Sequence, residues 1–128
     1  MKKFILFRTD RLGDFIITTR IIKSIQDKFS DGHITVLCSP LNIKFVRKYK
    51  IIDKIIVYDK KFSLLKKLKV FFYIINKNYY ASLAFDGKSF SNLCNLFLNA
   101  KYKLGLVYKY KVFGIPLFKP NFIYNFIV

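Results

Sequence analysis

Short apolar runs alternate with helix-patterned segments along most of this chain, and this alternation limits the possible folds more than any single motif. Residues 2–8, KKFILFR, form a continuous apolar run of a length typical of a strand buried on both faces. The next segment repeats its core-type residues at helical spacing, at Phe15, Ile16, Thr19, Ile22, Ile25 and Phe29. The pattern predicts strands over 2–8, 31–39, 53–59, 79–88 and 102–108, with helices over 15–29, 40–50, 62–78 and 89–100.

Strands that alternate with helices favour an α/β fold with a parallel sheet covered on both faces. We expect a Rossmann-like strand order of 3-2-1-4-5, in which the chain reverses direction between the first and fourth strands. Ligands bind beyond the carboxyl ends of the strands at such a point. The turns that meet there, residues 8–14 and 85–89, contain the candidate site residues Asp10, Arg11, Gly13, Asp14, Asp86, Gly87 and Lys88. Ser89 is the expected N-cap of the helix that follows the second turn.

The 128 residues are enough for one domain with its own core. The hydrophobic fraction of 53% is high, but no uncharged apolar run reaches the roughly 18 to 20 residues of a spanning helix. The start, MKKFILFRTD, meets a charge before a signal-peptide apolar region forms. We therefore expect a cytoplasmic protein. The pattern weakens beyond residue 108, where Gly114, Pro116 and Pro120 predict an irregular tail over 109–128.

The charge balance is strongly positive. The chain has 24 Lys and Arg against 7 acids, all of them Asp, for a net charge of +17. Such a field attracts polyanions, whether nucleic acid, anionic lipid or phosphorylated glycan. Compositional drift is an alternative explanation, because the Lys residues are scattered. No helix-turn-helix, RNP or zinc-finger signature is present, which disfavours nucleic acid.

Cysteine and histidine usage argues against a zinc site. Cys38, Cys94 and His33 are too few and too far apart for the four ligands of such a site. Both cysteines lie in apolar stretches. They are expected to be buried free thiols.

The turn RTDRLGD lacks the signatures of a nucleotide-binding turn. It has one Gly where a dinucleotide-binding turn has three, and it lacks the Walker pattern. Asp14 at the start of the helix would also repel a phosphate from the helix amides. The sequence therefore predicts no nucleotide in this turn.

Two readings of Asp14 remain open. Its carboxylate can cap the helix, accepting hydrogen bonds from exposed amides. It can also act as a general base that takes a proton from a bound hydroxyl. Asp10 can form an Asx-turn or pair with Arg8 or Arg11.

Residues 8–40, RTDRLGDFIITTRIIKSIQDKFSDGHITVLCSP, closely resemble the opening of glycosyltransferase family 9, the ADP-heptose:lipopolysaccharide heptosyltransferases. The similarity continues through IIDKIIVYDKK, YYASLAFDGK and NAKYKLGLVYK, and covers about the first 108 residues. The resemblance implies one half of a GT-B glycosyltransferase, inverting transfer without a required metal, and Asp14 as the base on the acceptor hydroxyl. It assigns no catalytic role to Asp10.

The family's second half, which holds the nucleotide-sugar, has no counterpart in these 128 residues. We therefore expect a single acceptor-side domain over 1–128, with its core in 1–108 and no cofactor of its own. A complete enzyme would use a nucleotide-sugar donor, ADP-heptose or similar. The expected partners are an anionic glycolipid acceptor, the inner membrane surface and a donor-binding half. A fragment, a split or decayed gene product and a non-catalytic polyanion-binding module remain open alternatives.

Overall fold

The computed structural model describes residues 1–9, 12–86, 88–105, 111–112, 115–116 and 126–127. Its main sheet has the order β3-β2-β1-β4-β5-β8, and every neighbouring pair is parallel. The strands are β1 (Lys3–Arg8), β2 (His33–Cys38), β3 (Lys54–Val57), β4 (Asn78–Ala84), β5 (Asn99–Gly105) and β8 (Phe126–Ile127). The helices are α1 (Leu12–Lys28), α2 (Ile43–Lys48), α3 (Leu64–Ile75) and α4 (Ser89–Phe97). Two further short strands, β6 (Lys111–Val112) and β7 (Ile115–Pro116), pair antiparallel with each other.

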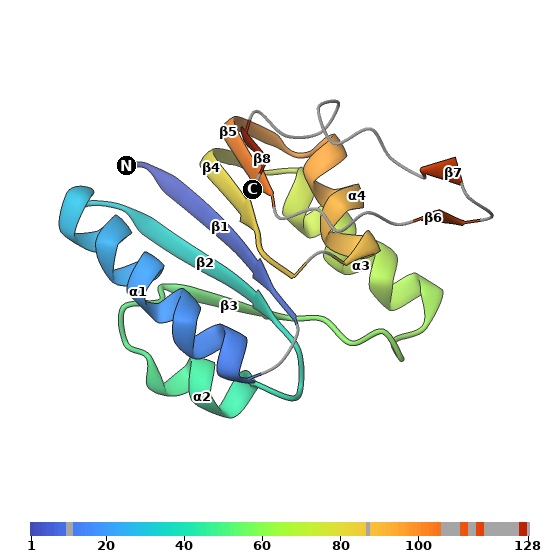
Figure 1. Cartoon of the computed structure of the whole chain (residues 1–128), viewed down its shortest axis with the longest axis horizontal. Helices are drawn as coiled ribbons and strands as arrows, with labels where there is room; N and C mark the ends of the chain where they lie inside the picture. The colour runs from blue at the N-terminus through green and yellow to red at the C-terminus, as the bar shows by residue number, and fades with distance from the viewer. Residues whose placement is uncertain (10–11, 87, 106–110, 113–114, 117–125, 128) are drawn as a thin grey trace.

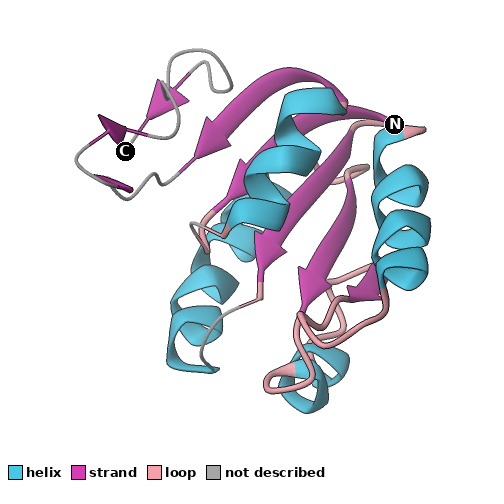
Figure 2. Cartoon of the chain, turned by 90° about the vertical axis from the view of Figure 1, so that its right-hand side faces the viewer, coloured by secondary structure: helices cyan, strands magenta, loops and turns pink. Residues whose placement is uncertain are grey.

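The expected order 3-2-1-4-5 is confirmed, and β8 extends the sheet beyond β5. Figure 2 shows the strands running in one direction with helices on both sides of the sheet. Parallel neighbours require a crossover, and each crossover up to β5 contains one of the four helices. The carboxyl ends of β1 and β4 therefore lie side by side at one edge, which we call the carboxyl edge.

Strand β1 lies at the centre of the sheet and contributes to both layers of the core. Ile5 and Phe7 belong to the cluster that packs under α3 and α4. Phe4 and Leu6 alternate with them and belong to the cluster under α1 and α2. The continuous apolar run is thus explained, because this strand has no solvent-facing side. Figure 1 shows α1 and α2 over one half of the sheet and α3 beside α4.

One expectation for α1 is wrong. Ile16 was placed with the core-facing residues, but its side chain is 57% exposed. Phe15 and Ile22 are buried as expected, and Thr18 lies on the same helix face, at the i, i+3 and i+7 spacing. At 3.6 residues per turn, Ile16 points about 100° away from Phe15 and away from the sheet. No helix among the described residues is both long and apolar enough to cross a membrane.

Core and surface isoleucines should therefore differ sharply in their effect on stability. Ile5→Ala removes a fully buried side chain and should lower the free energy of unfolding by about 2 to 5 kcal/mol. Ile16→Ala, the matched control, should change it by about 0.5 kcal/mol or less. Urea denaturation of both variants measures the difference. Equal losses would contradict the assignment of the α1 faces.

Both cysteines are buried and unbonded to each other, which confirms the expected free thiols. Burial raises the pKa of Cys38 from 9.0 to about 11, although Arg47 lowers it in part. Burial, and secondarily the charge of Asp86, raises the pKa of Cys94 well above its usual value. Both side chains are therefore neutral thiols at pH 8.

A thiol reagent should consequently distinguish the folded from the unfolded chain. At pH 8 the folded chain should react slowly with Ellman's reagent, because the attacking thiolate is scarce and inaccessible. In denaturing urea both thiols should react at the rate of a free cysteine. Fast stoichiometric labelling under native conditions would place at least one cysteine outside the core.

Candidate functional site

The turns that follow β1 and β4 are bonded to each other at the carboxyl edge. The guanidinium of Arg8 donates from Nη1 to the carbonyl oxygen of Phe85 at 2.7 Å. The amide of Phe85 donates to the carbonyl oxygen of Phe7 at 3.2 Å. The two loops predicted to form one crevice are therefore neighbours, as the strand order requires.

Asp86 holds this junction together. Its side chain is only 4% exposed. Oδ2 accepts hydrogen bonds from the Thr9 hydroxyl at 2.7 Å, the Ser91 hydroxyl at 2.8 Å and the Thr9 amide at 3.3 Å. Oδ1 accepts from the Lys88 amide at 3.1 Å. One carboxylate thus links the end of β1 to the beginning of α4, and hydrogen bonding to backbone and hydroxyl donors compensates for its burial.

The N-terminus of α4 differs from the expectation that Ser89 caps it. Lys88 is the N-cap residue and makes no side-chain capping bond, while Ser89 is already the first helical residue. The carboxylate of Asp86 binds the Lys88 amide and the Ser91 hydroxyl instead. A negative charge at the start of a helix is favourable because it interacts with the helix dipole. The serine at position 89 is therefore not needed as a cap.

A second buried side chain fastens β2 to the same edge. The amide group of Asn42 donates from Nδ2 to the Arg8 carbonyl at 3.1 Å, and its Oδ1 accepts from the Ser39 amide at 3.0 Å. Asn42 is fully buried and precedes α2 as its N-cap residue. Reasoning from the sequence missed this residue. The available signal was an Asn two residues after Pro40, at a position where Asn is common before a helix.

Polar side chains continue below Asp86 between α4 and the sheet. Asn95 donates from Nδ2 to the Ser91 carbonyl at 2.9 Å and contacts the Ser82 hydroxyl through Oδ1. The ammonium of Lys103 donates to the Asn95 carbonyl at 2.6 Å, and burial lowers the pKa of this lysine. Buried polar groups that are paired in this way hold α4 in a single position on β4 and β5.

Ring stacking holds the start of α4 from its other side. The rings of Tyr58, just after β3, and Phe90, in the first turn of α4, are stacked with centroids 3.8 Å apart. Burial raises the pKa of Tyr58, so its hydroxyl is neutral over the physiological range. The beginning of α4 is thus positioned by both a carboxylate and an aromatic pair.

The remaining predicted site residues divide into two groups. The backbones of Gly13 and Asp14 form part of the first turn of α1, and Lys88 is exposed at the start of α4. A Cβ added to Gly13 would meet no atom of the described residues within 4 Å. Asp10, Arg11 and Gly87, and the side chain of Asp14, lie outside the described residues. Of the residues in the two predicted turns, the structure shows Asp86 hydrogen-bonded to Thr9, the residue directly before Asp10.

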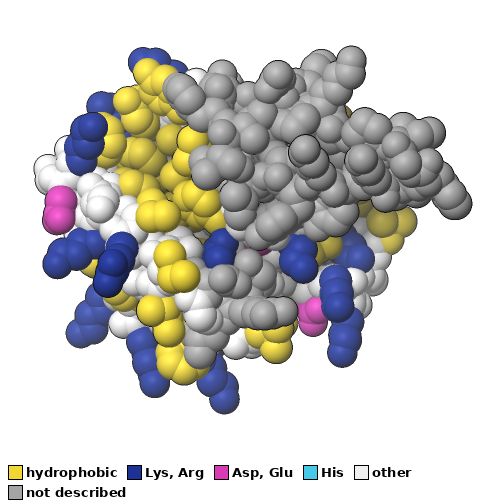
Figure 3. Space-filling view, viewed as in Figure 1, with side chains coloured by type: hydrophobic (Ala, Val, Ile, Leu, Met, Phe, Trp, Pro, Cys, Tyr) yellow, Lys and Arg dark blue, Asp and Glu magenta, His cyan; other side chains and the backbone are white. Residues whose placement is uncertain are grey.

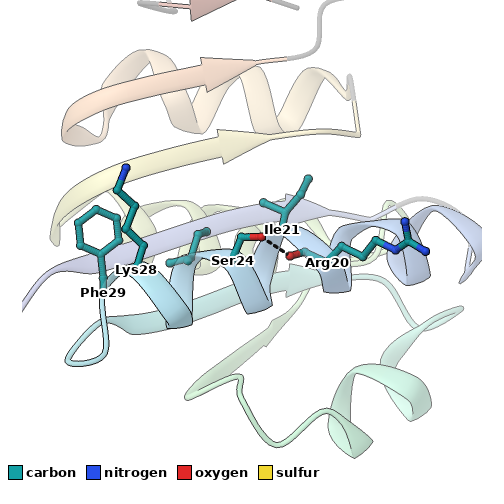
Figure 4. A pocket seen from close by; sticks show the side chains of 6 residues that line it. Arg20, Ile21, Ser24, Lys28 and Phe29 are labelled. Atoms are coloured by element: carbon teal, nitrogen blue, oxygen red, sulfur yellow. Dashed lines mark hydrogen bonds between the residues drawn. The ribbon is translucent and has the colours of Figure 1, made fainter.

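An open groove of about 300 Å³ lies along the second half of α1, away from the carboxyl edge. It is lined by Arg20, Ile21, Ser24, Ile25, Lys28 and Phe29 (Figure 4). The Ser24 hydroxyl in this groove donates to the Arg20 carbonyl of its own helix at 2.9 Å. The groove is thus separate from the crevice between β1 and β4. Within the described part of the chain, no three His, Cys, Asp or Glu side chains are grouped so that they could hold a metal ion.

Comparison with known proteins gives matches in structure only. No protein-family model matches the sequence, and a search of curated proteins finds no match. Among solved structures, a family 9 glycosyltransferase from Veillonella parvula superposes with a TM-score of 0.71 at 20% identity. ADP-heptose lps heptosyltransferase II from E. coli gives 0.65 at 15% identity, and E. coli heptosyltransferase WaaC, solved with ADP, gives 0.68 at 14%.

The superpositions cover 84%, 83% and 81% of this chain, but only 32%, 30% and 35% of the respective neighbours. The chain thus spans about a third of the length of these glycosyltransferases. Identities this low establish the fold alone. The Rossmann-like fold implied by the sequence resemblance to family 9 is confirmed.

Because the carboxylate of Asp86 is buried and bonded at the junction, we expect its removal to lower the free energy of unfolding. Asp86→Ala removes four hydrogen bonds and leaves the hydroxyls of Thr9 and Ser91 without this acceptor, so it should cost roughly 2 to 4 kcal/mol. Asp59→Ala is the matched control, because Asp59 follows β3 at the same edge and accepts one exposed bond, from the Lys61 amide. Its loss should be about 1 kcal/mol or less. Similar losses in urea denaturation would show that Asp86 does not hold the junction.

Proposed function

We propose that this chain is the acceptor-side part of a heptosyltransferase-like glycosyltransferase. The complete enzyme would transfer a sugar from a nucleotide-sugar to a lipid-linked acceptor in the biosynthesis of lipopolysaccharide core or a related surface glycan. The observation that carries the proposal is the position of the RLGD turn. It leads from the carboxyl end of β1 into α1 beside the turn after β4, in a fold shared with heptosyltransferases.

Asp14 is the proposed general base. Its backbone lies in the first turn of α1, where the helix dipole favours an ionised carboxylate. In an inverting displacement, the carboxylate takes the proton from the acceptor hydroxyl as that oxygen bonds to the anomeric carbon. The bond from the anomeric carbon to the nucleotide oxygen breaks, and the nucleotide diphosphate leaves with the electron pair.

Asp86 has a different role in this proposal. Because its oxygens are engaged with Thr9, Lys88 and Ser91, it positions the two turns. We assign contact with the acceptor to the surrounding candidates, Asp10, Arg11, Gly13, Gly87 and Lys88. Among these, Lys88 is an exposed cation at the start of α4.

The donor belongs to a second unit in this proposal. Displacement requires the hydroxyl and the anomeric carbon to be held in line by one frame, and this chain supplies one side of that frame. The donor would be ADP-heptose or a similar nucleotide-sugar, held by a donor-binding half. One of the structures that this chain resembles, WaaC, was solved with ADP.

An anionic glycolipid is the proposed acceptor, met on the cytoplasmic side of the inner membrane. Lys and Arg side chains are spread over the face in Figure 3, where acidic side chains are sparse. The net charge of +17 supports attraction to a phosphorylated glycan. A non-catalytic polyanion-binding module is the competing reading, since it would use the same charge without Asp14.

Replacement of Asp14 tests the catalytic proposal. Asp14→Asn should abolish transfer, while the free energy of unfolding falls by about 1 kcal/mol or less, because position 14 is the third residue of α1 and the change removes only a favourable charge near the helix N-terminus. The assay mixes the chain with the C-terminal half of E. coli ADP-heptose lps heptosyltransferase II, supplies ADP-heptose and a lipid-linked acceptor, and measures ADP release.

Lys23→Gln, an exposed change on α1, is the control and should keep the parent rate. Full activity of Asp14→Asn would remove the general-base role. Calorimetry of the chain alone should show no saturable ADP binding, since the donor site is proposed to lie elsewhere. Salt-sensitive glycan binding without any transfer would favour the polyanion-binding module.

A further inference from the structure

Helix α3 is apolar on both its inner and its outer side. Ile74 is buried against the sheet, with Val70 and Phe71 packed beside it. On the opposite side, Leu65, Leu68 and Phe72 are 67%, 42% and 51% exposed. Their spacing of three and four residues places them on one continuous stripe. An ordinary surface helix has polar side chains at these positions, and a contiguous exposed apolar stripe of this kind is typical of an interaction surface.

The apolar stripe continues onto α4. Leu93 and Phe97 are exposed one turn apart on that helix. The Phe97 ring contacts the ring of Phe71 on α3, with centroids 5.9 Å apart. The two helices lie side by side in Figure 1. We call Leu65, Leu68, Phe72, Leu93 and Phe97 together the α3/α4 apolar surface.

Among the described residues, several lysines border this surface, and the nearest acid in the sequence is Asp59, which directly precedes them. Lys66 and Lys69 are exposed on α3 itself, and Lys60 and Lys61 precede it. The sequence from residue 60 to residue 85 contains no Asp or Glu. At the far end of the helix, the ammonium groups of Lys54 and Lys77 lie 4.5 and 4.6 Å from the Tyr73 ring centroid.

We propose that the α3/α4 apolar surface docks onto an anionic lipid bilayer, with α3 lying in the interfacial plane. The Leu and Phe side chains would enter the boundary between headgroups and acyl chains, while the lysines extend to the lipid phosphates. Each Lys near an anionic surface adds to the binding, and the effect weakens with salt. A second copy of this chain fits less well, because two copies of net charge +17 repel each other.

This docking sets the direction in which the candidate site faces. Helices α3 and α4 both begin at the carboxyl edge, and Leu65 is in the first turn of α3. The lipid surface would therefore come close to the edge at which Asp86 joins the two turns. The functional value of this orientation rests on the proposed function, because a lipid-linked acceptor would then lie close to the candidate site. The docking itself is measured without a sugar donor or a glycan.

Cosedimentation with vesicles tests the proposal. The probe is a mixture of phosphatidylglycerol and phosphatidylcholine, with pure phosphatidylcholine for comparison. The parent chain should bind the anionic vesicles more tightly, and binding should weaken as salt is raised. Replacing Leu65, Leu68 and Phe72 together by Gln should reduce binding about tenfold or more, because three exposed apolar side chains no longer insert.

The control for the triple variant replaces Ile16, Ile17 and Leu41 by Gln, three apolar residues of equal or greater exposure outside the α3/α4 apolar surface. It should bind within about twofold of the parent. Thermal melting should show that both triple variants remain folded, since all six positions are exposed.

A second pair of variants separates charge from apolar insertion. Lys66→Gln with Lys69→Gln should lower binding to anionic vesicles and remove much of the salt dependence. Lys23→Gln with Lys44→Gln carries the same charge change on α1 and α2 and should have the smaller effect.

Three outcomes would overturn the docking proposal. The first is equal binding of the parent chain to neutral and anionic vesicles, and the second is an equal loss of binding in the two triple variants. The third is a parent chain that binds no vesicles but forms a dimer, if the dimer is dissociated only by the variant at Leu65, Leu68 and Phe72. The last would assign the surface to self-association. Failure of sugar transfer with normal vesicle binding would affect the proposed function and leave the docking surface intact.

Discussion

The buried carboxylate of Asp86 is the interaction on which the carboxyl edge of this protein depends. It binds the residue after β1, and it provides the charge at the N-terminus of α4. Arg8 and Asn42 add bonds on either side, from β1 to β4 and from β1 to β2. Three loops that are far apart in sequence are thereby fixed to the end of one strand. A site built from these loops would inherit that rigidity, which is the condition for holding an acceptor in one orientation.

The fold was largely predictable from local pattern, whereas the contacts that shape the site were not. A central strand buried on both faces appears in the sequence as the uninterrupted run KKFILFR, and the alternation of strands and helices determines the crossovers. The roles of Asp86 and Asn42 depend on partners 77 and 34 residues away. No spacing rule along the chain indicates such pairs. Ser89 was the candidate cap because a serine before a helix is a local signal, but the carboxylate of Asp86, three residues earlier, binds the start of α4 instead.

The outer faces of α3 and α4 differ in chemical character from the carboxyl edge, because they expose apolar side chains. A helix that is apolar on both sides, next to an edge held rigid by buried polar bonds, separates two tasks within one domain. The polar bonds hold the loops in place, and the exposed Leu and Phe side chains remain available to a partner. The proposed acceptor-side role would use both properties, because such a domain has to hold its loops and approach a lipid-linked substrate.

The central position of β1 also constrains the order in which the chain can fold during synthesis. Phe4 to Phe7 pair with β2 on one side, but their other neighbour is residues 81–84 of β4. Ile5 and Phe7 are not covered by both α3 and α4 until residue 97, the last of α4, has been made. β1 is therefore fully enclosed only after β4 and α4, which follow it in the chain, have been made. A nascent chain of this topology exposes the apolar strand β1 until those later elements have been made, which is the situation in which chaperones are most often needed.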